Sequence, residues 1–181
     1  MKNTRDIIIA LALIFGAIFT VNAQAPYKNS IGVTVGNFQA FSYKTFVTNH
    51  FAVQLDLGTK ITRGADENWA ADIWTFEFNP NFMYEGHFTK GLYGFIGGGV
   101  SLGYNWGYYH DVNFFGFHWG GRTGDNGKFG ANGILGLEYI FSAPVTMQLD
   151  FRPGYGLLFN DNDWHWSYFD WSVNLGVRYA F

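Results

Sequence analysis

The stretch Ser167-Tyr-Phe-Asp-Trp-Ser-Val-Asn-Leu-Gly-Val-Arg-Tyr-Ala-Phe181 decides the fold. From Phe169 onward every odd-numbered residue is apolar or aromatic, and every even-numbered residue is polar or small. This period of two predicts a β-strand with one apolar face. The strand is much longer than the roughly five or six residues common in soluble proteins. We therefore expect the rest of the chain to supply further long, alternating strands.

The composition fits a surface that meets lipid. The chain has 181 residues, enough for one domain, with 21% aromatic and only 14% charged residues. Soluble domains carry more charge, nearer about a quarter of their residues. The mean hydropathy of -0.02 does not argue against a membrane protein. Membrane-spanning strands mix lipid-facing and lumen-facing residues, so their average hydropathy is low.

The amino terminus has the pattern of a secretion signal. Lys2 and Arg5 precede an apolar run over residues 7–19, and a small-residue cleavage site ends at Ala23. The apolar run is short for a membrane-spanning helix. We therefore predict a signal peptide over residues 1–23 and one domain over residues 24–181. The chain has no cysteine, which excludes disulfides and a lipid-modified cysteine.

Several classes of partner are disfavoured by the sequence. The formal net charge is -3 and no basic patch is present, so we expect no nucleic acid. The five histidines show no paired metal-ligand spacing on one strand face. We expect neither a metal nor a cofactor.

Alternation of apolar and polar residues recurs along the chain. It predicts eight strands over residues 30–36, 40–47, 51–62, 71–85, 91–105, 129–141, 145–159 and 167–181. Pro80 falls in the fourth of these, on its apolar face, and predicts a kink or bulge there because proline cannot donate to a ladder. Short turns at Thr48, Gly86 and Ser142 alternate with longer connections, of which residues 106–128 form the longest. Short turns at one end and long loops at the other are typical of outer-membrane barrels.

The predicted fold is all-β: an eight-stranded antiparallel up-and-down transmembrane β-barrel. The segments 43–46, 130–139 and 147–153, together with the aromatic final strand, resemble the small OmpA/OmpX-like outer-membrane barrels of Gram-negative bacteria. The resemblance covers nearly all of the domain and implies a place in the cell outer membrane, in contact with its lipid. It also implies that the barrel-assembly machinery recognises the terminal strand, with Tyr179 and Phe181 as the signal.

The inward face of such a barrel carries both signs of charge. An eight-stranded barrel is just wide enough to be filled by its own side chains, and buried charges must be paired. We therefore predict one connected acid–base network in the lumen. Its members are Lys44, Asp56, Glu77, Glu138, Asp150, Arg152 and Arg178.

These features predict a function as a structural or interaction protein with a filled lumen and exposed loops. The longest connection contains aromatic residues that suit either a membrane-interface girdle or the binding of an extracellular protein or glycan: Trp106, Tyr108, Phe115, Phe117 and Trp119. A first alternative is binding or transport of a small or apolar ligand through the barrel mouth or a lateral opening.

A second alternative is an enzyme that modifies lipid A. His165 and Ser167 are spaced as in the Ser–His pair of lipid A deacylases, which they resemble. Nucleophilic catalysis of this kind also needs a carboxylate to orient the histidine. No Glu follows Glu138 in the sequence, so we expect no enzymatic activity.

Overall fold

The chain folds into long β-strands. The computed structural model describes residues 25–66, 69–112, 118–121, 126–160 and 163–181, and the side chains of residues 62–73, 107–125 and 160–167 lie outside that description. The described strands are β1 (Asn29–Gly36), β2 (Phe38–Phe46), β3 (Phe51–Asp66), β4 (Trp69–Thr89), β5 (Leu92–Val112), β6 (His118–Gly121), β7 (Asn126–Ile140), β8 (Val145–Asn160) and β9 (Asp163–Ala180).

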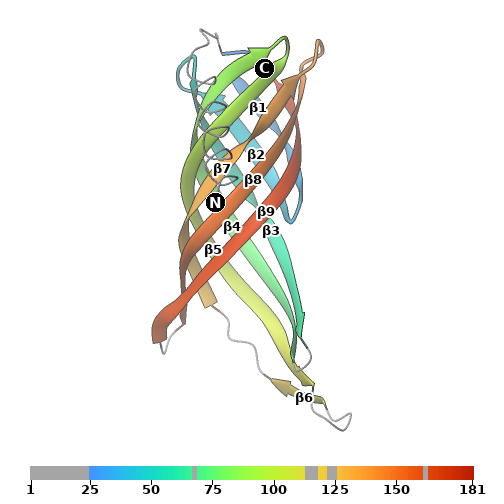
Figure 1. Ribbon diagram of the computed structural model, residues 1–181, viewed down its shortest axis with the longest axis vertical. Helices are drawn as coiled ribbons and strands as arrows, with labels where there is room; N and C mark the ends of the chain where they lie inside the picture. The colour runs from blue at the N-terminus through green and yellow to red at the C-terminus, as the bar shows by residue number, and fades with distance from the viewer. Residues whose placement is uncertain (1–24, 67–68, 113–117, 122–125, 161–162) are drawn as a thin grey trace, which may run out of the picture.

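Eight of these strands close into a barrel, shown in Figure 1. Each strand pairs antiparallel with its neighbours, in the order β1, β2, β3, β4, β5, β7, β8 and β9, and β9 pairs with β1 to close the ring. The short strand β6 pairs with the far end of β5 outside the ring. This arrangement confirms the predicted eight-stranded antiparallel up-and-down β-barrel.

The barrel closes beside the last residue of the chain. Asn29 and Phe181 exchange two backbone hydrogen bonds of 2.9 and 2.8 Å. Ser30 then pairs with Ala180, and the register continues to Gly36 opposite Asn174. We call this end of the barrel the terminal end and the other end the mouth.

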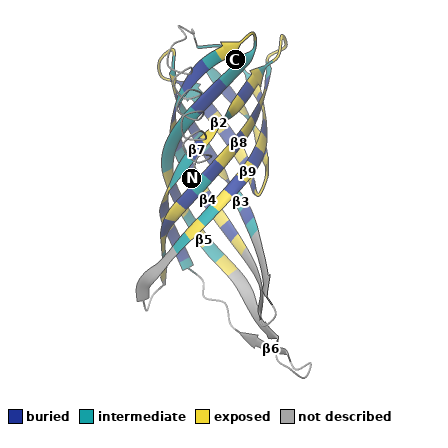
Figure 2. Ribbon diagram, in the orientation of Figure 1, coloured by how far each residue is buried: buried dark blue, intermediate teal, exposed yellow. Residues whose placement is uncertain are grey.

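Burial alternates along the strands, as Figure 2 shows. The outward residues are apolar, and those nearest the two ends of the barrel are often aromatic. On β4, outward Tyr84 and Trp74 are ten residues apart, which spans about 25 Å in a tilted strand and matches the apolar band of a membrane barrel. A closed barrel with this outer surface is a transmembrane barrel. Among the described residues, no helix is long and apolar enough to cross a membrane.

Of the kink or bulge predicted at Pro80, the register excludes the bulge. The ladder between β4 and β5 lacks pairs at Asn79 and Pro80, but it keeps the same register on both sides. Pro80 has no N–H to donate, so the ladder loses hydrogen bonds at this point. Neither strand carries an extra residue there. The irregularity on this ladder lies instead between His87 and Thr89.

The eight barrel strands are longer than the alternation predicted, the first two by only one residue. Most of the predicted connection over residues 106–128 is strand, because β5 runs to Val112, β6 covers His118–Gly121 and β7 begins at Asn126. The predicted start of the second strand at residue 40 is also corrected. β2 begins at Phe38, whose side chain is buried inside the barrel.

Candidate functional site in the barrel interior

A chain of ionic contacts fills the terminal half of the lumen. Lys44 lies between two carboxylates: its ammonium forms an ion pair with Glu85 and lies 2.5 Å from Glu138 Oε2. Arg178 Nη1 lies 3.8 Å from the other oxygen of Glu138. These four residues come from β2, β4, β7 and β9, and all are buried. The contacts therefore tie opposite walls of the barrel together.

Gln148 extends this chain toward the middle of the barrel. Its side-chain oxygen accepts a 2.6 Å hydrogen bond from Arg178, and its amide donates a 2.8 Å bond to Asp150. Arg152 then holds Asp150 through Nε at 2.7 Å and Asp56 through Nη1 at 2.7 Å. Ion pairs and hydrogen bonds thus join one assembly, which we call the main network: Glu85, Lys44, Glu138, Arg178, Gln148, Asp150, Arg152 and Asp56.

A second group of charges lies nearer the mouth. Lys128 forms ion pairs with Glu77 and, at 2.7 Å, with Asp170. Lys60 lies 3.1 Å from the same oxygen of Asp170. The Lys128 ammonium also lies 4.5 Å from the ring centre of Tyr168. We call Lys60, Glu77, Lys128 and Asp170 the mouth cluster.

A small cavity separates the two groups. Its volume is about 20 Å³, enough for about one water molecule. Arg152 of the main network and three residues of the mouth cluster line it, together with Phe38, Asn79, Ser101, Asn132 and Ser172. The Phe38 ring lies against the Arg152 guanidinium, 5.9 Å from ring centre to Cζ. Described side chains therefore fill the lumen on both sides of this water-sized space.

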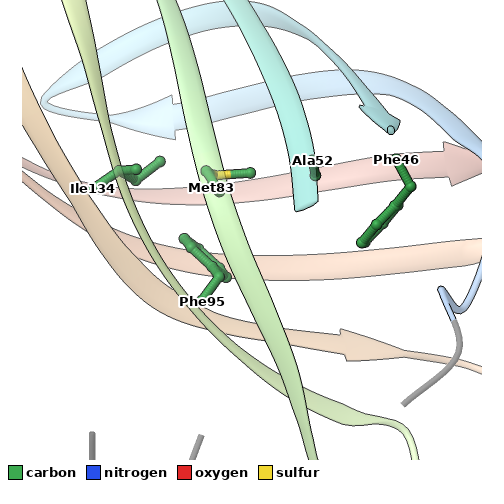
Figure 3. Close-up of a cluster of buried hydrophobic side chains, with 5 residues drawn as sticks. All are labelled: Phe46, Ala52, Met83, Phe95 and Ile134. Carbon is green, nitrogen blue, oxygen red and sulfur yellow. The ribbon is translucent and has the colours of Figure 1, made fainter. Parts of the chain in front are cut away.

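An apolar cluster packs around the Lys44 ammonium in the terminal half of the lumen, and Figure 3 shows its side chains. It consists of the buried side chains of Phe46, Ala52, Met83, Phe95 and Ile134. Tyr27, which precedes β1, packs edge-on against Phe46 with ring centres 5.2 Å apart. Its hydroxyl donates to Glu138, 2.9 Å from Oε1 and 3.1 Å from Oε2. Burial is the main cause that raises the pKa of the Tyr27 phenol. The phenol therefore keeps its proton at neutral pH and donates it to the hydrogen bond with Glu138.

The Tyr27 contact predicts a specific loss of stability. Replacing Tyr27 by Phe keeps the ring but removes a donor to the buried Glu138 carboxylate, which costs about 1 to 2 kcal/mol. The matched control is Tyr43→Phe, because the Tyr43 hydroxyl bonds to Asn29 at an exposed position and its loss costs less than about 0.5 kcal/mol. Urea unfolding in lipid vesicles measures both. Equal losses would show that the Tyr27 bond does not stabilise Glu138.

The seven lumen residues predicted from the sequence are all buried, but they divide into two groups. Six belong to the main network, whereas Glu77 belongs to the mouth cluster. Sequence reasoning missed Lys128 because the strand was predicted to begin at residue 129, although its even number already matches the inward face. It also missed Tyr27, which lies outside every alternating segment.

Other predicted sites are located only in part. Tyr179 and Phe181 face outward with ring centres 6.3 Å apart, and their role in assembly stays a prediction. Trp106 is exposed on β5. For the remaining candidates, the side chains or the whole residues lie outside the described part of the chain: Tyr108, Phe115, Phe117, Trp119, His165 and Ser167.

No protein-family model matches this sequence, and no curated protein matches it. The solved structures that are similar in fold include two outer-membrane proteins. The N-terminal β-barrel domain of Pseudomonas aeruginosa OprF has a TM-score of 0.52 and 17% identity, covering 88% of this chain and 100% of its own. A major outer membrane protein of Thermus thermophilus has a TM-score of 0.51 and 11% identity, covering 84% of this chain and 98% of its own. The protein therefore has the fold of the small outer-membrane β-barrels.

Proposed function

We propose that the protein is an outer-membrane barrel with a closed lumen, which anchors and presents its external strands and loops for interaction. In this orientation the terminal end faces the periplasm and the mouth faces the outside. The supporting observation is the filled interior. The apolar cluster and the main network together occupy the terminal half of the barrel, and the mouth cluster lies beyond them. Only a cavity of about 20 Å³ separates the main network from the mouth cluster.

The strands near the mouth support an interaction role. β3, β4 and β5 continue well beyond the end of the β1–β2 hairpin, and β6 adds a further pairing to β5. A barrel that served only to fill the membrane would not need this extension. The extended strands present backbone and loop surface outside the bilayer, where extracellular proteins or glycans could bind.

The closed lumen predicts an absence of steady conductance in planar bilayers. The charges of the main network are held by each other, so ions have no continuous aqueous path. Reproducible conductance of the parent protein at a fixed level would contradict the proposal.

We propose no catalytic role. The enzymatic alternative depends on His165 and Ser167, whose side chains lie outside the described part of the chain. Mass spectrometry of lipid A from cells with and without the gene tests it directly. A lipid A species that depends on both the gene and Ser167 would replace the present proposal by an enzymatic one.

A further inference from the structure

The barrel wall is incomplete on one side. β1 and β2 have 8 and 9 residues, whereas their neighbours β9 and β3 have 18 and 16. The last pair between β1 and β9 is Gly36 with Asn174, and the first pair between β2 and β3 is Phe38 with Lys60. Beyond these pairs, in the described chain, no strand lies between β9 and β3. Figure 1 shows the two strands parting beyond the hairpin.

This notch lies within the thickness of the membrane. On β9, Asn174 is five residues from outward Tyr179, which corresponds to a height of about 13 Å in a tilted strand. The apolar band of a membrane barrel is about 25 Å tall. The hairpin therefore ends near mid-membrane, and the edges of β9 and β3 above it face lipid.

At the base of the notch, contacts from Asn37 and Lys60 take the place of the hydrogen bonds that a neighbouring strand would make with β9. The backbone N–H of Asn37 donates to Val173 O at 3.3 Å, and its side-chain oxygen accepts from Val173 N at 3.3 Å. Lys60 crosses from β3 and donates to the Trp171 carbonyl of β9 at 3.3 Å and to Asp170 at 3.1 Å. Because Lys60 and Asp170 also line the central cavity, this contact is the side wall between the cavity and the lipid.

Of the three buried lysines of the lumen, Lys60 has the fewest carboxylate partners among the described residues. Its described partner, Asp170, lies closer to Lys128, at 2.7 Å against 3.1 Å. Lys128 has Glu77 as a second partner, and Lys44 has two carboxylates of its own. An incoming anion can therefore take over Lys60 while Asp170 stays neutralised by Lys128.

The surface beside the notch is apolar and bare. Phe41 on β2 and Phe169 on β9 are 74% and 69% exposed, the highest values among the large apolar side chains that the structure describes. Trp171 on β9 is also exposed. A hydrocarbon chain in the outer leaflet can lie along these rings with its head group at Lys60.

We propose that the notch between β3 and β9 is a binding site for a single-chain amphiphile with an anionic head group. The head group pairs with Lys60 in place of Asp170, and the chain lies against Phe169 and Trp171. This inference goes beyond the proposed function, because it concerns the outer wall and requires no passage through the lumen.

The test uses palmitic acid with a photoreactive diazirine in its chain. The purified protein is reconstituted in phosphatidylcholine vesicles, irradiated with the probe, and digested for mass spectrometry. We expect adducts on residues 60–61 and 169–172 that saturate with probe concentration and decrease with excess unlabelled palmitate. Adducts on outward residues of β8, where the wall is complete, should increase linearly and resist competition.

Variants test the role of the lysine. Lys60→Gln should raise the probe concentration for half-saturation by about tenfold, the effect of losing a hydrogen bond to a charged group. Lys60→Arg, which keeps the cation, should remain near the parent value. Lys28→Gln at the terminal end is the control for a general loss of surface charge. A heat-dependent gel shift shows that each variant is folded.

Three results would each overturn the proposal. Labelling at the notch could rise linearly, as it does on β8. Hexadecanol could compete as well as palmitate, which would exclude recognition of an anionic head. A photoreactive phosphatidylcholine could label the notch in a saturable way, which would assign the site to a bilayer phospholipid. None of these results depends on conductance, so they leave the closed-lumen proposal to its own test.

Discussion

Replacing Arg152 by leucine is expected to destabilise the folded barrel by about 3 to 5 kcal/mol. Arg152 holds the carboxylates of Asp150 and Asp56 at 2.7 Å each, and all three side chains are buried. Removing the guanidinium leaves two like charges without their cation in a medium of low dielectric constant. Loss of the partner charge dominates the effect, because leucine still fills much of the space.

The matched control for this prediction lies on the same strand. Leu149→Val removes one methylene from a side chain that faces lipid, and lipid tails are as apolar as leucine, so the expected cost is below about 1 kcal/mol. Combining Arg152→Leu with Asp56→Asn and Asp150→Asn should recover part of the lost stability, since the unpaired charges are then gone. Urea titration in vesicles measures all three proteins. An Arg152→Leu barrel as stable as the parent would show that this ion-pair group does not stabilise the fold.

The faces of the strands could be predicted from the sequence. With a period of two, the apolar residues of a strand lie on one face, toward lipid, and the polar residues lie on the other, toward the lumen. Arg178 and Glu138, for example, follow directly from the alternation around them. The same rule would have placed Lys128 inward had the strand been extended by a few residues. Composition hid that extension, because the segment before it is rich in glycine and aromatic residues.

The pairing partners could not be predicted in the same way. Arg152 reaches Asp56 across the barrel, 96 residues away, and such contacts depend on how the closed ring shifts each strand along its neighbour. Tyr27 is a stronger case, because a lone aromatic residue before the first strand carries no signal of its bond to Glu138, 111 residues away.

The short β1–β2 hairpin also shows what could not be predicted from the sequence. Its ends at Gly36 and Phe38 are close to those expected from the alternation. Its consequence, however, appears only when the lengths of β3 and β9 are known. The notch and the position of Lys60 across it therefore follow from three-dimensional register rather than from any local motif.

Replacing Phe181 by Asp is expected to remove most of the assembled barrel from the outer membrane. We propose that this substitution prevents recognition of the final strand by the assembly machinery. It is not expected to act by destabilising the folded barrel. The backbone of Phe181 pairs with Asn29 whatever its side chain, and the ring is 59% exposed at the terminal end. Near the membrane interface a carboxylate costs only about 0 to 1 kcal/mol. This small destabilisation of the folded barrel cannot explain a loss of nearly all assembled protein.

Phe141→Asp separates the two explanations. Phe141 is also exposed at the terminal end, just after β7, and its backbone bonds to Val145 across the turn. The substitution places the same charge at the same end of the barrel but leaves the final strand intact. Heat-dependent mobility of outer-membrane fractions should show assembled Phe141→Asp protein and little assembled Phe181→Asp protein. If both variants lose assembled protein to the same extent, the cost of a charge at the barrel rim explains the loss. In that case the final aromatic residue is not the assembly signal.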